Sequence, residues 1–375
     1  MEAVFSGYLP RSKHELQELI TNANIVFDSS SIFNLYRYKK DTTTNILSYL
    51  DIVKDRLFLP YIVGLEYHNN RASVLNQQRA IYSKLESKVE DLKKSLSEQF
   101  LQDQHSSVEM ESVQSIVDKF DKELTTYLNT CKKSHPNYLI NDPIRNQLVS
   151  LFQDRSGNVI SEVDLENIYN TAQSRFEKKI PPGYKDSKNK DKQFKTFGAQ
   201  TIWCKYADYI IWYEIINHGK KTNNSTLLIC DERKEDWLWE ENGYKLGPRP
   251  ELFTEYKNET GKEFHLMSLL EFFENLKSLE IHSFSDKAIT DIKSSSNIPW
   301  RDEVKNAFLA MGGTASLEQI YGFIEKSTSR NLTKEWKGTV RKAIYYYCSD
   351  RDLFLGKENL YKALSDSKYK LILEN

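Results

Sequence analysis

Two aspartates that lie far apart in the sequence each follow a short apolar run. Asp28 follows residues 25–27 and Asp231 follows residues 226–230. Short runs of β-branched and aromatic residues between polar turn residues are typical of buried strands in a parallel sheet. Ligands bind outside the carboxyl ends of such strands. Because two neighbouring carboxylates are costly unless a cation joins them, the pair predicts a cation site at one edge of a sheet.

Two further acids belong to segments that could reach the same edge. Asp208 lies in the apolar stretch 202–212, where a buried carboxylate needs either a metal ion or a salt bridge. Glu66 follows a second predicted strand. The alternative to a role at the sheet edge is that Glu66 is a solvated residue on a helix. For Asp28 alone, capping of the next helix is an equally good interpretation.

Together the four acids indicate one kind of chemistry. Hard oxygen ligands without histidine or cysteine favour Mg²⁺ or Mn²⁺ over zinc. Such a cluster suits phosphodiester hydrolysis, in which one or two ions activate a water and stabilise the leaving oxygen. We therefore interpret Asp28, Glu66, Asp208 and Asp231 as candidate metal ligands and catalytic residues.

The elements that would position these acids alternate between strands and helices. Strands are predicted at 25–27, 56–59, 226–230 and 263–267, and helices at 12–22, 31–40, 163–178, 199–218 and 269–279. Apolar residues at helical spacing between 72 and 130 predict two long antiparallel helices. The alternation predicts an α/β fold with a parallel sheet and right-handed crossovers.

Composition limits the class of protein. The 375 residues carry a formal charge of −1, with a net +3 confined to residues 298–375, so any basic surface is local. Residues 185–195 contain five lysines and are either a solvated loop or a loop that grips phosphates. The four cysteines show no paired spacing, which favours free thiols. The sequence shows neither the pattern of a signal peptide nor that of a membrane span, so we expect a cytoplasmic protein that does not contact membranes.

Several segments resemble the motifs of bacterial PIN-like domain proteins. They are FDSSSIFNLYRY at 27–38, LEYHNNR at 65–71, ADYIIW at 207–212, CDERKEDWLW at 230–239 and GPRPEL at 247–252. The resemblance covers roughly residues 10–280. It implies a PIN-like nuclease fold in which Asp28, Glu66, Asp208 and Asp231 are, in this order, the acids around a divalent metal.

The resemblance also points to residues around these acids. Ser29 matches the hydroxyl residue that usually follows the first aspartate, and Ser30 stands where asparagine is usual. Asp236 is either a further metal ligand or the partner of Arg233 or Lys234. Arg71 and Arg249 either clamp a phosphate or form structural ion pairs with these acids. These alternatives remain open at the level of the sequence.

The C-terminal residues resemble the winged-helix domains attached to bacterial restriction and defence proteins. Three predicted helices, the last at 334–347, precede a predicted wing at 353–361. Basic residues recur at helical spacing on the third helix and predict contact with nucleic acid, with a solvated face or protein contact as alternatives. These residues are Lys334, Lys337, Arg341 and Lys342.

We thus expect an α/β chain with a PIN-like nuclease domain at 1–280, a helical-hairpin insertion at 72–130, a linker at 281–297 and a small winged helix-turn-helix domain at 298–375. The leading hypothesis is a metal-dependent nuclease that prefers RNA to DNA and acts as a toxin-like effector in bacterial defence or stress response. One alternative is an inactive PIN-like protein that binds nucleic acid or serves as a scaffold. Another is a DNA-specific nuclease positioned by the winged helix.

The two long helices form either an intramolecular hairpin or a homodimer contact. A regulatory protein partner is a further hypothesis.

Overall fold

The protein forms two compact units. The computed structural model describes residues 5–9, 11–102, 109–134, 136–187, 190–231, 235–241, 244–295, 300–328, 332, 334–356 and 359–372. The first unit comprises Met1–Leu65 and Leu151–Asn375, and the second comprises Glu66–Ser150. Helix α5 (Tyr61–Gln102) begins in the first unit and continues into the second.

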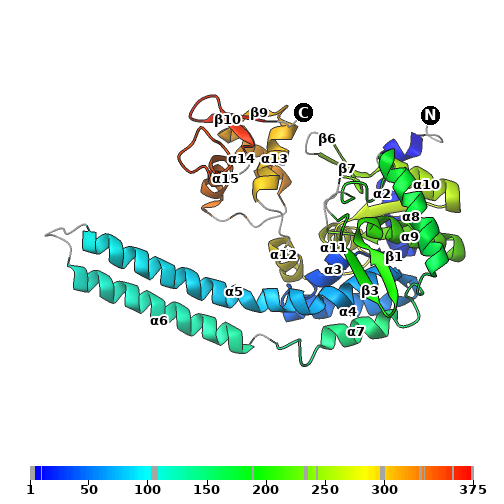
Figure 1. The fold of residues 1–375 in the computed structure, drawn as a ribbon, viewed down its shortest axis with the longest axis horizontal. Helices are drawn as coiled ribbons and strands as arrows, with labels where there is room; N and C mark the ends of the chain where they lie inside the picture. The colour runs from blue at the N-terminus through cyan, green and yellow to red at the C-terminus, as the bar shows by residue number, and fades with distance from the viewer. Residues whose placement is uncertain are drawn as a thin grey trace. The chain divides into compact units, whose positions relative to one another are not determined.

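A four-stranded parallel sheet forms the centre of the first unit (Figure 1). The strands are β1 (Asn24–Phe27), β2 (Leu57–Phe58), β5 (Thr226–Ile229) and β8 (Phe264–Met267), in the order β2-β1-β5-β8. The central strands β1 and β5 are buried along their whole length, which is why their sequences are continuous apolar runs. This sheet confirms the predicted α/β class and all four predicted strands.

Helices precede, connect and follow these strands. They are α2 (Lys13–Asn22), α3 (Ser29–Asn34), α4 (Lys40–Ile52), α8 (Glu162–Glu177), α9 (Ala207–Thr222), α10 (Pro250–Thr260), α11 (Leu269–Ser278) and α12 (Asp286–Ser295), with short 3₁₀ turns at Ser6–Tyr8, Lys54–Arg56 and Cys204–Tyr206. Capping boxes begin α2 and α11, where Ser12 pairs with Glu15 and Ser268 with Glu271. Helix α12 occupies part of the predicted linker, and its Asp291 accepts a hydrogen bond from the backbone N–H of Lys39 at 2.8 Å.

Two predicted helices have different limits. The helix predicted at 31–40 starts earlier, at Ser29, and ends at Asn34, and α4 follows as a separate helix. The helix predicted at 199–218 begins only at Ala207, because residues before it form the hairpin β3 (Phe194–Phe197) and β4 (Gln200–Trp203). A second hairpin, β6 (Leu238–Glu241) with β7 (Tyr244–Pro248), was not predicted.

Aromatic side chains fill the core beside the sheet. Trp212 of α9, Tyr256 of α10 and Phe264 of β8 are fully buried, and the Trp212 and Phe264 rings meet edge to face at 4.9 Å. The Tyr256 hydroxyl donates a hydrogen bond to the carbonyl of Asn224. It also shares a hydrogen bond of 2.8 Å with the hydroxyl of Thr226 in β5. These contacts hold α9 and α10 against the sheet.

The second unit is helical. Helices α5 and α6 (Met110–Ser134) run side by side in opposite directions in Figure 1, and α7 (Pro143–Phe152) follows them, beginning in this unit. Two ion pairs link α5 to α6, Lys93 with Asp121 at 2.8 Å and Glu86 with Lys132 at 2.5 Å. The two long helices predicted between 72 and 130 are thus present and antiparallel.

Residues 300–372 have a hydrophobic cluster of their own. Helices α13 (Trp300–Ala310), α14 (Leu317–Ser327) and α15 (Trp336–Tyr345) pack with a sheet of order β10-β11-β9, formed by Tyr361–Ala363, Lys368–Leu371 and Thr314–Ser316. A capping box of Ser316 and Gln319 begins α14. The third helix is shorter than predicted and leaves Lys334 in the preceding turn, and the hairpin lies at 361–371 instead of 353–361.

The cysteines and the hydropathy add two facts. No disulfide joins the four cysteines, of which Cys230 and Cys348 are buried and Cys131 and Cys204 half-buried. In the described part of the chain, no helix has the length and apolar character needed to span a membrane.

Candidate metal centre at the carboxyl edge of the sheet

Asp28 and Asp231 lie at the same edge of the parallel sheet. Strands β1 and β5 are paired in parallel with Phe27 opposite Ile229. The ladder continues one step beyond the strands, because the backbone N–H of Asp28 donates to the Ile229 carbonyl at 2.9 Å. Asp231 follows two residues after Ile229. The structure therefore places the two aspartates at the carboxyl ends of adjacent central strands.

Asp28 also caps α3. Its Oδ2 accepts hydrogen bonds from the Ser30 backbone N–H at 3.1 Å and from the Ser30 hydroxyl at 2.7 Å. The capping interpretation of Asp28 is thus correct. The neighbouring Ser29 is buried. Since the cap involves one carboxylate oxygen, it fixes the orientation of Asp28 and is compatible with a metal-binding role.

An asparagine that sequence reasoning missed orients Asp231. The side-chain amide of Asn34 donates to Asp231 Oδ2 at 2.6 Å, and the guanidinium of Arg37 donates to Asn34 Oδ1 at 2.7 Å. The other oxygen, Oδ1, accepts from the backbone N–H of Leu269 at the start of α11, at 2.9 Å. Asn34 lies within the motif FDSSSIFNLYRY, six residues after Asp28, and is buried on α3.

Burial controls the electrostatics of this edge. It raises the pKa of the Asp231 carboxyl, against the opposing effect of the hydrogen bonds from Leu269 and Asn34. Burial and the nearby Asp231 also raise the pKa of the Tyr38 hydroxyl. A desolvated carboxylate is stabilised by a cation, so this environment favours a positively charged ligand at Asp231.

Asp208 and Asp236 meet at the turn of residues 181–185. Asp208 lies in the first turn of α9, next to Gly183, where an added Cβ would approach the Asp208 Cβ to 3.2 Å. Gly183 also has a φ of +97°, which only glycine adopts easily. Asp236 is buried, and its Oδ2 accepts from the backbone N–H groups of Gly183 at 2.9 Å and Lys185 at 3.2 Å. Asp236 therefore holds this turn against Asp208, while Arg233 and Lys234 lie outside the described residues.

Glu66 and Arg71 belong to the second unit. Glu66 is the sixth residue of α5 and the first of that unit. Arg71 donates through Nε to the buried Asp142 at 2.6 Å and through Nη2 to the Tyr138 carbonyl at 2.8 Å. This ion pair joins Arg71 to Asp142, which is not one of the four candidate acids, and contact of Arg71 with phosphate stays a prediction.

The other predicted basic residues differ in their surroundings. Arg249 pairs through two hydrogen bonds with Glu251, at 2.6 and 3.2 Å. In the lysine-rich stretch, Lys185 pairs with Glu235 and Lys190 with Asp186, which supports a loop held by local ion pairs. The basic residues predicted on the third C-terminal helix are exposed, and they are Lys334, Lys337, Arg341 and Lys342.

The donor set fits a hard divalent cation in its chemistry. The Asp231 carboxylate oxygens accept hydrogen bonds from Asn34 and Leu269, and carboxylate oxygens are preferred ligands of hard divalent cations. Within the described residues, however, no three or more histidine, cysteine or acidic side chains lie close enough together to hold a metal ion. The four predicted acids are therefore not gathered into a preformed cage, and their common role remains a prediction.

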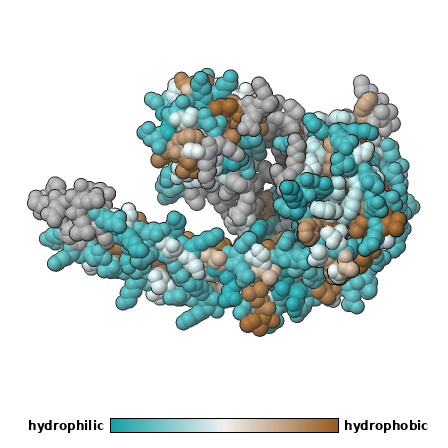
Figure 2. Space-filling view, viewed as in Figure 1, coloured by the Kyte–Doolittle hydropathy of each residue, from teal (hydrophilic) through white to brown (hydrophobic). Residues whose placement is uncertain are grey.

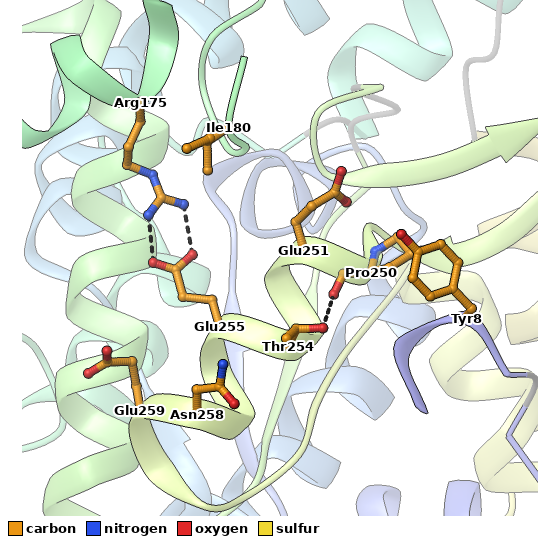
Figure 3. A pocket seen from close by; sticks show the side chains of 9 residues that line it. All are labelled: Tyr8, Arg175, Ile180, Pro250, Glu251, Thr254, Glu255, Asn258 and Glu259. Atoms are coloured by element: carbon orange, nitrogen blue, oxygen red, sulfur yellow. Dashed lines mark hydrogen bonds and ion pairs between the residues drawn. The ribbon is translucent and has the colours of Figure 1, made fainter. Parts of the chain in front are cut away.

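A pocket of about 390 Å³ beside α10 has the wrong charge for nucleic acid (Figure 3). Its wall carries Glu251, Glu255 and Glu259 on successive turns of α10. Glu255 pairs with Arg175, Glu251 with Arg249 and Glu259 with Lys220. The Glu255 carboxylate also accepts from the Trp212 indole at 2.9 Å. These ion pairs favour a structural role for the pocket wall.

The fold and the site together define a parallel α/β domain with an acidic carboxyl edge. The family model of the PIN-like domain matches residues 24–252, more than half of the chain, and the chain belongs to this family. The match runs from β1 into α10 and includes all four predicted acids. Domains of this superfamily are commonly metal-dependent nucleases. Neither the curated proteins nor the solved structures contain a match to the chain.

Proposed function

We propose that the PIN-like domain is a Mg²⁺- or Mn²⁺-dependent nuclease. The observation that carries the proposal is the placement of Asp28 and Asp231 at the carboxyl ends of two adjacent parallel strands. Ligand sites of open α/β sheets occur at this edge. Family membership supports the same reaction class.

Each residue at the edge has a defined part in this proposal. Asp28 and Asp231 hold the cation, and Asn34 fixes the Asp231 carboxylate through its amide. Asp208 and Glu66 are proposed as the remaining ligands, and Asp236 acts through the turn that it holds. A bound divalent cation would lower the charge repulsion between the acids and the phosphodiester and stabilise charge on the phosphate oxygens.

The test is cleavage of a panel of single- and double-stranded RNA and DNA with Mg²⁺ or Mn²⁺. We expect wild type to cut, with RNA preferred, and the double variant Asp28→Asn with Asp231→Asn to lose the activity. The matched control is Asp55→Asn, because Asp55 is an exposed aspartate just before β2, at the amino edge of the same sheet. Failure of wild type to cut any substrate, or equal cutting by the double variant, would reject the proposal.

The C-terminal module is part of the same proposal as a winged helix that binds nucleic acid. Its third helix exposes basic residues, and the Lys337 ammonium lies over the rings of Tyr321 at 5.3 Å and Trp336 at 5.8 Å. An exposed cationic helix next to a hairpin suits contact with a phosphate backbone. By analogy with the resembling domains, we propose a toxin-like effector role in bacterial defence or stress response, with nucleic acid as the partner.

A second candidate function is nucleic-acid binding without cleavage. It is favoured by Ser30, which stands where asparagine is usual in the motif after the first aspartate. Calorimetric titration with Mn²⁺ separates the two candidates, because a nuclease should bind the ion and the Asp28→Asn, Asp231→Asn variant should not. If wild type releases no heat with Mn²⁺ yet binds RNA, the non-catalytic function is the correct one. A strict preference for duplex DNA in the cleavage panel would favour the DNA-specific alternative.

A further inference from the structure

Helices α5 and α6 form a hairpin with little core of its own. From residue 76 to residue 127, no described apolar side chain is buried. Leu128 of α6 is the first buried apolar residue after this stretch. Two helices alone cannot enclose a hydrophobic core, and helical hairpins of this length usually complete one by pairing with further helices.

The residues through which α5 and α6 face each other follow a common spacing. They are among the partly or fully buried positions of residues 76–134, and in both helices they recur at intervals of four, four, three, four and three. On α5 they are Gln78, Tyr82, Glu86, Val89, Lys93 and Leu96, and on α6 they are Val113, Val117, Asp121, Leu124, Leu128 and Cys131. The ion pairs Lys93–Asp121 and Glu86–Lys132 join the helices along or beside this seam.

A second, exposed stripe lies one position before the seam on each helix. On both helices it has the spacing i, i+4, i+7 and i+11, with apolar residues in three of the four places. On α5 it consists of Ile81, Leu85, Lys88 and Leu92, and on α6 of Ile116, Phe120, Glu123 and Tyr127. The six apolar residues are between 45 % and 68 % exposed.

Both stripes lie on the same side of the hairpin. One position before the seam corresponds to a rotation of about 100° about each helix axis. Because α5 and α6 run in opposite directions, these rotations turn the two stripes toward one common face. The pKa of the Tyr127 hydroxyl is raised by its hydrogen bond to Cys131 and, to a smaller extent, by Tyr82 of α5, which agrees with this arrangement.

The opposite face is polar. One position beyond the seam, α5 carries Ser83, Ser87, Glu90 and Lys94, and α6 carries Asp118, Lys122, Thr125 and Asn129. The side of the hairpin that is turned toward the viewer in Figure 2 is mainly hydrophilic. The hairpin is therefore amphipathic as a whole, with one apolar and one polar face.

We propose that the apolar face is a homodimer interface, through which two copies of this chain form a four-helix bundle. Its single Lys88 and single Glu123 give the face no net charge, so it suits a copy of itself better than a polyanion. A large apolar side chain has an area of roughly 170 Å², and about half of it is exposed in each of the six residues. The face therefore offers about 500 Å² of apolar surface per copy. A dimer would then bury about 1,000 Å², which reaches the lower limit of specific interfaces.

The test is the solution mass of the full chain by size-exclusion chromatography with light scattering. We expect wild type at twice the 43.9 kDa of one chain, and the variant Ile116→Glu with Tyr127→Glu at the mass of a monomer. These are the most exposed side chains of the face, so their replacement should not prevent folding. Ser87→Glu with Thr125→Glu is the matched control on the polar face and should stay dimeric.

A second variant, Leu85→Glu with Phe120→Glu, tests the same face at other positions, and circular dichroism verifies the helix content of each variant. A monomeric wild type would overturn the proposal, as would a dimer that survives both apolar-face variants. If hydrogen exchange in a monomeric wild type shows the apolar face protected, another part of the chain covers it and the proposal is wrong. The test is independent of cleavage, so loss of the dimer and loss of nuclease activity are separate outcomes.

Discussion

At the scale of single residues, the most informative contact is the one between Asn34 and Asp231. The Asn34 amide orients a proposed metal ligand, and Arg37 holds the amide from the other side. Removing such an orienting group typically weakens metal binding about 10–100-fold. We predict a loss of this size in Mn²⁺ affinity for Asn34→Ala, measured by calorimetry. Asn22→Ala, at an exposed asparagine of α2, should bind Mn²⁺ as wild type does, and equal affinity in both variants would contradict the role of Asn34.

Glu214 of α9 gives the protein a pH-dependent stability. Its Oε1 accepts the backbone N–H of Tyr61 at 2.7 Å, at the start of α5, and an added Cβ on Gly157 would collide with the same oxygen. Burial raises the pKa of Glu214 from 4.5 to about 7. Because the folded state binds this proton more tightly than the unfolded state, the stabilisation is complete below about pH 4.5 and is lost as the pH rises through 7.

We predict that Glu214→Gln removes this part of the pH dependence. In wild type, the free energy of unfolding should fall by up to about 3 kcal/mol between pH 4.5 and 7 from this group alone. The glutamine stays neutral, so urea unfolding of the variant should show a correspondingly flatter profile. Glu162→Gln, at an exposed glutamate of α8, should keep the wild-type profile. A steep profile in Glu214→Gln would assign the pH dependence to other groups.

At the scale of elements, the turn at 181–185 depends on Asp236. Loss of a buried carboxylate that accepts two backbone hydrogen bonds should lower the free energy of unfolding by about 2–3 kcal/mol in Asp236→Ala. Glu235→Ala removes only an exposed ion pair with Lys185, and we expect a loss below about 1 kcal/mol. Asp236 either binds the metal ion or only holds the turn, and Mn²⁺ titration of Asp236→Asn decides between these roles. If Asp236 is a metal ligand, the variant should bind Mn²⁺ more weakly, as Asp28→Asn should.

The C-terminal hairpin carries a pair of like charges. Lys362 of β10 lies directly opposite Lys370 of β11, and both are exposed. Like charges at opposed positions cost about 0.2–1 kcal/mol, so Lys362→Glu should stabilise the protein by this amount. If the hairpin contacts nucleic acid, the same variant should bind more weakly in fluorescence anisotropy. Lys326→Glu on α14 is the control, and unchanged binding in Lys362→Glu would exclude the hairpin from the interface.

Local signals predicted the elements that carry their own pattern. The apolar residues 25–27 of β1 and 227–229 of β5 are continuous runs that the sequence shows directly. Strand β4 lies within the segment predicted as the start of a helix, because its pairing with β3, Phe194 with Trp203, overrides local preference. Asn34 was missed for a similar reason, because its partner Asp231 lies 197 residues away. The sequence thus located the acids, and only the structure located the groups that orient them.

At the scale of the whole molecule, the two compact units differ in how much apolar surface they bury. The first is organised around β1 and β5, which are buried throughout, whereas the described residues 76–127 bury no apolar side chain. Local stability follows burial, so backbone amides of the hairpin should exchange with solvent faster than those of the sheet. Hydrogen exchange followed by mass spectrometry measures both sets in one experiment.

Dimer formation should slow hydrogen exchange mainly at the backbone amides of the hairpin, and much less at those of the sheet. If the apolar face of α5 and α6 is the dimer interface, raising the protein concentration from near the dimer dissociation constant to about a hundredfold above it stabilises the hairpin by up to about 2.7 kcal/mol. Exchange at residues 76–134 should then slow with concentration, while exchange in β1 and β5 changes less because opening of the hairpin does not require the sheet to unfold. In Ile116→Glu with Tyr127→Glu, hairpin exchange should be fast and independent of concentration. Concentration-dependent protection that persists in this variant would place the dimer contact on another surface of the molecule.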